Sequence, residues 1–248
     1  MLKNHNKDSE NKNQDKSPRI FQREKIKTSL SIRERLDFTP KQKEFIRLAL
    51  DKQTKVLITD GLWGTSKTFL TIYCALKLLN DRRISEIIYI RNPIESSSVS
   101  KLGYLKGDID EKMAPYSSPL FDKLEELLPV GEMNALINEN RIKIMAPGFI
   151  RGHSWNCKVI IVDESSCLTI EDLFLIISRV GEFSKIYFIG DSFQNDIGSK
   201  SGFLKFFHTF NDQESKDNGI FTFEFKDNAD IVRSSLLRFL MKKLKLTG

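Results

Sequence analysis

Short apolar runs alternate along the chain with longer segments whose hydrophobic residues recur at helical spacing. Runs of four or five residues rich in Ile, Val, Phe and Tyr predict strands, because these side chains suit a pleated, buried surface. The runs occupy residues 55–59, 87–90, 142–145, 158–162, 185–189 and 221–225. Helical spacing is found over residues 40–49, 67–80, 169–180 and 229–245. This alternation predicts an α/β fold with a mostly parallel central sheet and helices on both faces.

Two of the predicted strands end in polar residues. The run at residues 158–162 has four consecutive apolar residues, which is typical of a central parallel strand, and it ends in Asp163 and Glu164. The run at residues 185–189 ends in the sequence GDSFQ. Open α/β sheets bind ligands at the carboxyl ends of their strands, so both ends are candidate ligand sites. The alternative for Asp163 and Glu164 is the acidic start of the following helix.

Residues 102–128 read LGYLKGDIDEKMAPYSSPLFDKLEELL, a turn-rich stretch that runs into an amphipathic helix. The residue types assign no chemistry to this segment. We expect it to be an inserted lid or a surface for a partner.

Residues 1–37 are rich in Lys, Asn, Asp, Ser and Gln and have almost no apolar residues before Ile20. Burial of so few apolar groups cannot offset the entropy of ordering, which predicts a disordered charged tail over 1–37 and one domain over 38–248. The tail holds ten Lys/Arg and six acids, so it carries most of the chain's net charge of +6. The tail either contacts nucleic acid non-specifically or is merely solvated. Net charge therefore does not indicate a strongly basic surface on the domain.

The three cysteines follow no metal-binding or disulfide spacing, and they are expected to be core thiols in a reducing compartment. No apolar run is long enough to span a bilayer, and the N-terminus lacks the hydrophobic segment of a signal peptide. A cytoplasmic protein without membrane contact is expected.

The segment from residue 55 to 79 combines a strand, a glycine-bearing loop and a helix. It matches the phosphate-loop pattern except that Ser66 replaces the glycine before Lys67. Backbone N–H groups of such a loop, together with the positive end of the helix dipole, surround a phosphate. Lys67 would hold the β- and γ-phosphates of ATP and Thr68 would ligate Mg²⁺. The alternative is a strand–turn–helix with a chance Lys-Thr pair. The predicted nucleotide-binding residues of this segment are Gly61, Gly64, Thr65, Ser66, Lys67 and Thr68.

Four further residues are candidates for nucleotide binding or chemistry. Asp163 would accept Mg²⁺ through its water shell, and Glu164 would polarise the attacking water. Gln194, at the end of its strand, would sense the γ-phosphate. Gln42 lies in the first turn of a helix that Thr39 caps and Pro40 begins. It is either a reader of the adenine edge or a surface residue.

The ordered motifs GLWGTSKT, LGYLKGDIDEKMAPY, FIRGHSWN, IIVDE and GDSFQ together resemble the PhoH family of phosphate-starvation-inducible ATPases, over residues 38–246. The chain looks like one of the short members that bacteriophages carry. The resemblance implies a RecA-like phosphate-loop ATPase that is related to the motor core of superfamily 1 helicases and is associated with RNA or single-stranded nucleic acid.

The resemblance also extends to individual positions. It matches Lys67 and Thr68 to the phosphate and Mg²⁺ residues, Asp163 and Glu164 to the Walker B pair, and Gln194 to the γ-phosphate sensor. It adds Arg91 and Arg151 as nucleotide-binding residues and Arg233 as an arginine finger. Because such a finger often comes from a neighbouring subunit, a homo-oligomer is expected, with a hexameric ring as one form.

The chain departs from the family pattern at two places. Ser66 puts a side chain where the backbone approaches the phosphates, and Ser165 and Ser166 replace the last two residues of the family's DEAQ motif. Neither change removes a residue that touches Mg²⁺ or water, so we expect ATP binding with slowed hydrolysis. The rival hypothesis is a nucleotide-binding regulatory or interaction module with little or no turnover. The Asp-Glu pair and the GDSFQ motif disfavour a small-molecule kinase.

Overall fold

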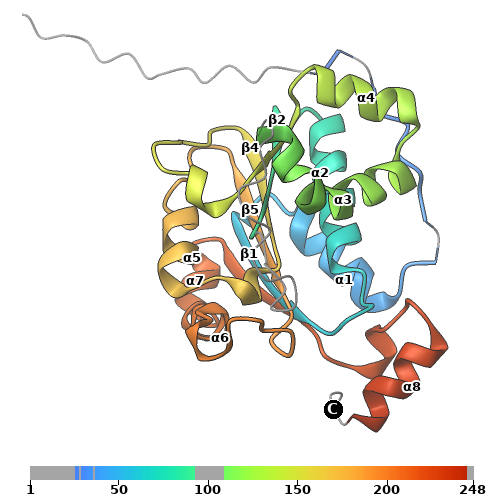
Figure 1. The fold of residues 1–248 in the computed structure, drawn as a ribbon, viewed down its shortest axis with the longest axis vertical. Coiled ribbons are helices and arrows are strands. Elements are labelled where there is room, and N and C mark those ends of the chain that lie inside the picture. Colours follow the sequence, from blue (N-terminus) through green and yellow to red (C-terminus); the bar gives the residue numbers. More distant parts are fainter. Residues whose placement is uncertain (1–25, 28, 36, 93–108, 245–248) are drawn as a thin grey trace, which may run out of the picture.

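The computed structural model describes residues 26–27, 29–35, 37–92 and 109–244, with only the backbone for residues 109–116. Six strands of this part form one wholly parallel sheet in the order β3-β2-β4-β5-β1-β6 (Figure 1). The predicted α/β, RecA-like fold is confirmed, and each predicted strand lies within two residues of its observed bounds. The bounds are β1 (Val56–Gly61), β2 (Glu86–Arg91), β3 (Ile142–Met145), β4 (Lys158–Asp163), β5 (Lys185–Gly190) and β6 (Ile220–Phe225).

The strands at the centre of the sheet are buried on both faces. All six residues of β1 and of β5 are buried, as are the last five of β4, which accounts for their unbroken apolar runs. The register pairs Arg91 with Asp163 and Asp60 with Gly190. The carboxyl ends of β2, β4, β5 and β1 therefore meet at one edge of the sheet.

Helices cover both faces of the sheet. One face is packed by α1 (Pro40–Leu50), α2 (Lys67–Asn80), α3 (Ile109–Leu127) and α4 (Val130–Asn138). The other carries α5 (Ile170–Ile177), α6 (Phe203–Thr209) and α7 (Gln213–Asp217) (Figure 1). The sequence reasoning did not identify α4, α6 and α7, which are short.

Capping boxes set the starts of α1 and α5. The Thr39 hydroxyl accepts from Gln42 N at 3.1 Å while Gln42 Oε1 accepts from Thr39 N at 3.1 Å, and Pro40 begins α1 as predicted. Thr169 and Asp172 form the same reciprocal pair before α5. Both helices therefore begin where their sequences indicate.

The last helix was predicted to begin at residue 229 or 230, and this start is wrong. A short 3₁₀ turn (Asn228–Asp230) comes first, and α8 (Ser235–Lys243) begins only after Ser234, whose hydroxyl accepts from Leu237 N at 3.1 Å. Between them, Val232 N and Arg233 N donate to Gly64 O at 2.9 and 3.2 Å. Because these N–H groups bond to a distant loop, the backbone here does not follow a helical path.

Part of the segment predicted to be a disordered tail packs on the domain. Ile26 and Leu30 are buried against the core, and Leu30 N donates to Asn80 Oδ1 at 2.7 Å. For residues 26–27 and 29–35 the prediction is corrected, because the few apolar residues there meet grooves between helices that sequence composition does not reveal. Residues 1–25 lie outside the described part.

Several smaller expectations can also be compared with the structure. Cys74, Cys157 and Cys167 are buried free thiols, as predicted. In the described ranges, no helix has the length and apolar character needed to cross a membrane. The expected lid or partner surface at residues 102–128 falls partly outside the described residues, and its later part forms the whole of α3.

Candidate active site

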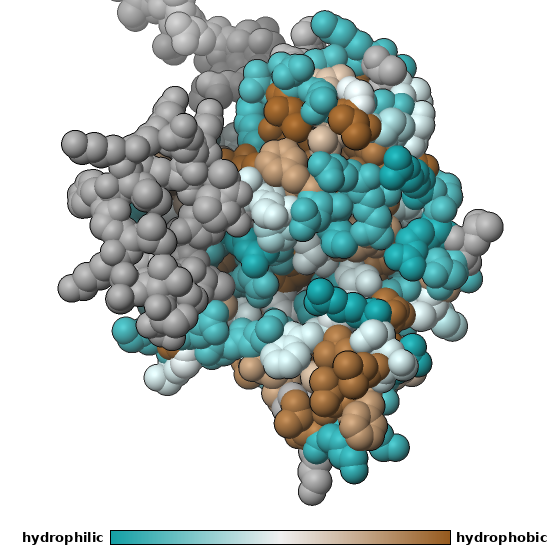
Figure 2. Space-filling model, turned by 45° about the vertical axis from the view of Figure 1, so that its right-hand side comes forward, coloured by the Kyte–Doolittle hydropathy of each residue, from teal (hydrophilic) through white to brown (hydrophobic). Residues whose placement is uncertain are grey.

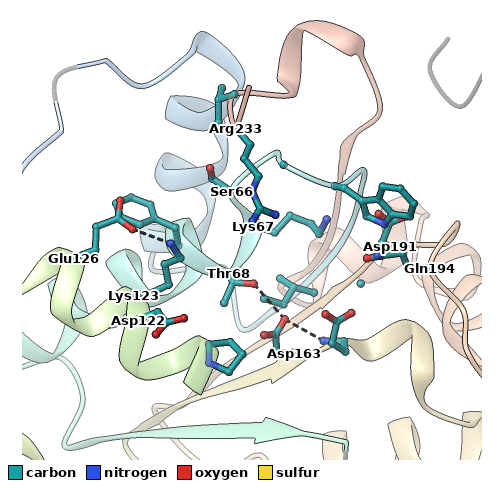
Figure 3. Close-up of a pocket in the computed structure, with 18 of the residues that line it drawn as sticks. Ser66, Lys67, Thr68, Asp122, Lys123, Glu126, Asp163, Asp191, Gln194 and Arg233 are labelled. Carbon is teal, nitrogen blue, oxygen red and sulfur yellow. Dashed lines mark hydrogen bonds and ion pairs between the residues drawn. The ribbon is translucent and has the colours of Figure 1, made fainter. Parts of the chain in front are cut away.

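A cavity of about 680 Å³ opens at the edge of the sheet where β1, β4 and β5 end (Figure 3). Three sequence motifs that lie far apart in the chain meet in its walls: the phosphate loop, the Asp-Glu pair and the GDSFQ loop. The lining residues are Arg35, Trp63, Gly64, Ser66, Lys67, Thr68, Phe69, Pro119, Asp122, Lys123, Glu126, Asp163, Glu164, Ile189, Gly190, Asp191, Gln194, Val232 and Arg233.

The phosphate loop joins the end of β1 to the start of α2. The Thr65 hydroxyl donates to Leu62 O at 2.8 Å and is fully buried, which fixes the turn of the loop. Lys67 Nζ donates to the carbonyls of Gly61 and Leu62, the latter at 2.9 Å. Burial lowers the pKa of the Lys67 ammonium against the attraction of Asp191 and other carboxylates. The structure thus places a largely desolvated cation at the head of α2, where an anionic ligand would be attracted.

Ser66 has a left-handed backbone with φ of 66°, directly before α2. Only glycine adopts this conformation without cost, and a serine there stores about 1 kcal/mol of strain or more. The Ser66 side chain makes no capping hydrogen bond and lines the cavity. Ser66 therefore replaces the glycine of the phosphate-loop pattern at a position whose backbone conformation favours glycine.

Asp163 is buried at the end of β4 and has polar neighbours on several sides. Its carboxylate accepts from Thr68 Oγ1 at 3.3 Å, from Tyr89 Oη, and from Glu164 N at 3.0 Å. Arg91 completes the environment with an ion pair at 3.2 Å. The hydroxyl and the carboxylate predicted to serve Mg²⁺ are thus in contact with each other.

Glu164 follows Asp163 in the left-handed conformation, with φ of 53°. Burial raises the pKa of Glu164, and the adjacent Asp163 charge raises it further. Arg91 opposes this shift through an ion pair with Glu164 at 3.3 Å. A partly buried carboxylate with a raised pKa is suited to act as a general base.

Arg91 was predicted to bind the nucleotide, and the structure shows it between the two acids. It bridges Asp163 and Glu164 from the neighbouring strand β2 and is not among the lining residues. Tyr89, two residues earlier on the same face of β2, was not predicted. The only indication in the sequence that Tyr89 belongs to the site was its polar hydroxyl in the otherwise aliphatic run of residues 87–90.

The GDSFQ loop after β5 forms the wall opposite α3, with Asp191 and Gln194 across the cavity from Asp122 and Lys123 (Figure 3). Asp60 at the end of β1 holds this loop, since its carboxylate accepts from Ser192 N and from Ser192 Oγ, both at 2.9 Å.

Asp191 also lines the cavity, and the sequence reasoning gave it no role. Burial raises the pKa of Asp191. Within the described part of the chain, one oxygen of the Asp191 carboxylate and Nε1 of Trp63 in the phosphate loop have no hydrogen-bond partner. A ligand in the cavity could satisfy either atom.

Arg233 extends toward Ser66 and Lys67 of its own chain (Figure 3). The backbone bonds from Val232 and Arg233 to Gly64 O hold it there, and Ile231, Leu237 and Met241 pack on Leu62 and Trp63. Gly64 has φ of 76°, and a Cβ atom built on it would lie 2.5 Å from Leu237. Arg233, the predicted arginine finger, thus lines the cavity of its own chain.

Five predicted residues are absent from the cavity wall: Gly61, Thr65 and Arg91, described above, and Gln42 and Arg151. Gln42 is buried, which rules out the surface alternative, and its amide is engaged: Oε1 accepts from Thr39 N, and Nε2 donates to Thr65 O at 3.4 Å. Arg151 is exposed in the loop between β3 and β4. The other predicted site residues lie in or beside the cavity.

The chain matches proteins of known families along most of its length. The PhoH family model, described as PhoH-like protein, matches residues 36–245. The PhoH-like protein of Synechocystis sp. is 30% identical over 206 residues, which cover 82% of this chain and 60% of that protein. The Bacillus subtilis PhoH-like protein is 32% identical over 163 residues, with coverage of 65% and 50%. That of Mycobacterium leprae is 31% identical over 166 residues, with coverage of 66% and 46%. The chain thus spans about half the length of the curated relatives it matches. These relatives are bacterial, and the expected bacteriophage origin stays a prediction.

Proposed function

This chain belongs to the PhoH family, and on that premise we propose that it binds Mg²⁺–ATP in the cavity and hydrolyses it. One observation carries the proposal: the contact between Thr68 and Asp163, in the same cavity as Lys67 and Glu164. This combination of one cation, one hydroxyl and two carboxylates suits phosphoryl transfer to water, which needs positioning and charge neutralisation.

The donor set fits Mg²⁺. This ion prefers oxygen ligands and keeps several waters, so one hydroxyl and one carboxylate are the contribution expected of the protein. Thr68 and Asp163 would hold it, and when bound it would neutralise charge on the phosphate oxygens. Lys67 and Arg233 would then orient the triphosphate from the loop side, and Glu164 would accept a proton from water.

The rival proposal is a nucleotide-binding module with little turnover, and Arg91 is the observation that favours it. Arg91 pairs with both acids at once, so Asp163 and Glu164 must exchange a protein cation for metal and water before they can act. A module that used ATP only to fix a conformation would tolerate this arrangement.

An assay of phosphate release, titrated with single-stranded RNA and single-stranded DNA, separates the two proposals. The enzyme proposal expects Mg²⁺-dependent release above the level of a Lys67→Ala control. Coupling to RNA or single-stranded nucleic acid, which we also propose, expects that one polymer stimulates the rate. ATP binding without release under any condition would favour the module.

We further propose that the chain associates with itself. Support comes from exposed apolar side chains on α8 and at its C-cap, where Leu236, Phe239, Leu240 and Leu244 are 65%, 55%, 44% and 60% exposed. Figure 2 shows this hydrophobic surface at the bottom of the view. Exposed apolar patches of this kind mark interaction surfaces. Light scattering with and without ATP would test it.

Ser66→Gly is expected to raise kcat/KM for ATP. The change removes a side chain from the cavity and relieves the left-handed backbone strain, and a tenfold gain corresponds to only about 1.4 kcal/mol. Steady-state kinetics at saturating Mg²⁺, with and without RNA, measure it. A lower kcat/KM than the native chain would mean that the serine hydroxyl contributes to binding.

A further inference from the structure

The cavity has a second half that the proposed phosphate chemistry does not use. The residues around Lys67, Asp163 and Gln194 occupy one side. The opposite side is built from α3, the first turn of α2 and the segment of residues 29–35 (Figure 3). Its lining residues are Arg35, Phe69, Pro119, Asp122, Lys123 and Glu126.

The Arg35 guanidinium lies over an aromatic ring on this side. Its Cζ atom is 5.4 Å from the centroid of Phe69, the residue directly after Thr68. Two hydrogen bonds to Asp37, at 3.1 and 3.0 Å, hold the guanidinium, and Glu126 lies 3.6 Å away. The Arg35 side chain is nevertheless 42% exposed. A planar cation is thus backed by Phe69 while part of it faces the cavity.

The backbone that carries Arg35 is anchored on three helices. Ser31 N donates to Glu132 at 2.7 Å, and Arg33 N donates to Leu127 O at 2.8 Å. Glu34 accepts from Tyr73 Oη at 2.6 Å and pairs with Lys77. These contacts to α4, α3 and α2 keep Arg35 at the cavity, although its segment has no regular secondary structure.

The residue predicted from sequence to read the base is occupied elsewhere. Both amide atoms of Gln42 bond to the backbone of the chain. On the far side of the cavity, by contrast, the Asp122 carboxylate has no hydrogen bond or ion pair within the described ranges, so it remains free to accept from a ribose hydroxyl.

We propose that Arg35 stacks on the nucleobase of the bound nucleotide, so that the segment before α1 contributes this one side chain to the nucleotide site. This inference rests on the proposed function. Guanidinium planes stack on aromatic rings, and a contact to the face of a base is tolerant of base identity. The triphosphate would then lie toward Lys67 and the nucleoside toward α3.

The test compares two ligands that differ by the nucleoside: Mg²⁺–ATP and Mg²⁺–tripolyphosphate, each titrated by calorimetry into the full chain. Arg35→Ala is expected to weaken ATP about tenfold, the effect of losing one desolvated cation–π stack, and to leave tripolyphosphate within about twofold. Arg33→Ala is the matched control, because Arg33 bonds to carbonyls of α3 at 2.9 and 3.3 Å without lining the cavity. It should change neither affinity.

Equal weakening of both ligands by Arg35→Ala, no weakening of either, or an equal loss of ATP affinity in Arg33→Ala would overturn the inference. If Arg35→Ala does not fold, Arg35→Lys decides, since it keeps the charge without the plane. It should still weaken ATP at least about threefold relative to tripolyphosphate. A native chain that binds neither ligand would refute the proposed function itself, a result distinct from a failure confined to the Arg35 variants.

Discussion

Lys67→Ala is expected to weaken ATP binding by about a hundredfold, or ~3 kcal/mol, because charge-assisted hydrogen bonds to two phosphates are lost together. Among the residues of the phosphate loop and the first turn of α2, Lys67 is the cation, and it is already largely desolvated. Its current partners, the carbonyls of Gly61 and Leu62, are weaker acceptors than phosphate oxygens. Titration of a fluorescent ATP analogue into the purified variant gives the affinity.

Lys55→Ala provides the control for this experiment. Lys55 is an exposed lysine at the opposite end of β1, beside Gly219. Its substitution by alanine therefore removes the same charge far from the cavity. ATP affinity should be unchanged in this variant. An unchanged affinity in Lys67→Ala as well would mean that the loop is not a nucleotide site.

Glu164→Gln is expected to slow hydrolysis at least about tenfold while ATP binding stays nearly intact. General-base assistance is commonly worth 10²- to 10⁴-fold, and an amide cannot accept the proton from water. The substitution keeps the size of the side chain. Single-turnover phosphate release, compared with the dissociation constant for ATP, separates the two effects.

Glu171→Gln is the matched control for Glu164→Gln, because it makes the same change at an exposed acid in the first turn of α5. Its turnover should equal that of the native chain. If Glu164→Gln instead lost binding and turnover in equal measure, Glu164 would be a structural partner of Arg91 and not the base.

The sequence predicts the elements of this site better than the contacts between them. The strands and the phosphate loop depend on local patterns, such as the apolar run before Asp163, and the structure confirms these strands. The position of Arg91 depends instead on the pairing of β2 with β4, which sets Arg91 beside Asp163. Composition and spacing do not encode this register, so Arg91 was expected on the nucleotide and Tyr89 was not expected at all.

The two errors at the ends of the domain have a similar cause. The apolar residues Ile26 and Leu30 are too sparse to predict order, yet they pack into grooves formed by helices far along the chain. Val232 and Arg233 lie in a stretch with helical spacing, but their N–H groups donate to Gly64 O in place of a helical partner. In both cases tertiary hydrogen bonds and packing outweigh local preference.

The strand order has a consequence for folding of the protein during its synthesis on the ribosome. β1 is the first strand to be synthesised, yet its two neighbours, β5 and β6, are the last two. A nascent chain halted before residue 185 contains the whole phosphate-loop sequence but neither strand that holds β1 in the sheet, and long-range pairing of this kind forms late. The proposed ATP site therefore forms only after most of the chain has been synthesised. In a series of ribosome-bound chains of increasing length, we expect no nucleotide binding until β6 and residues 232–233, which donate to Gly64 O, have left the ribosome.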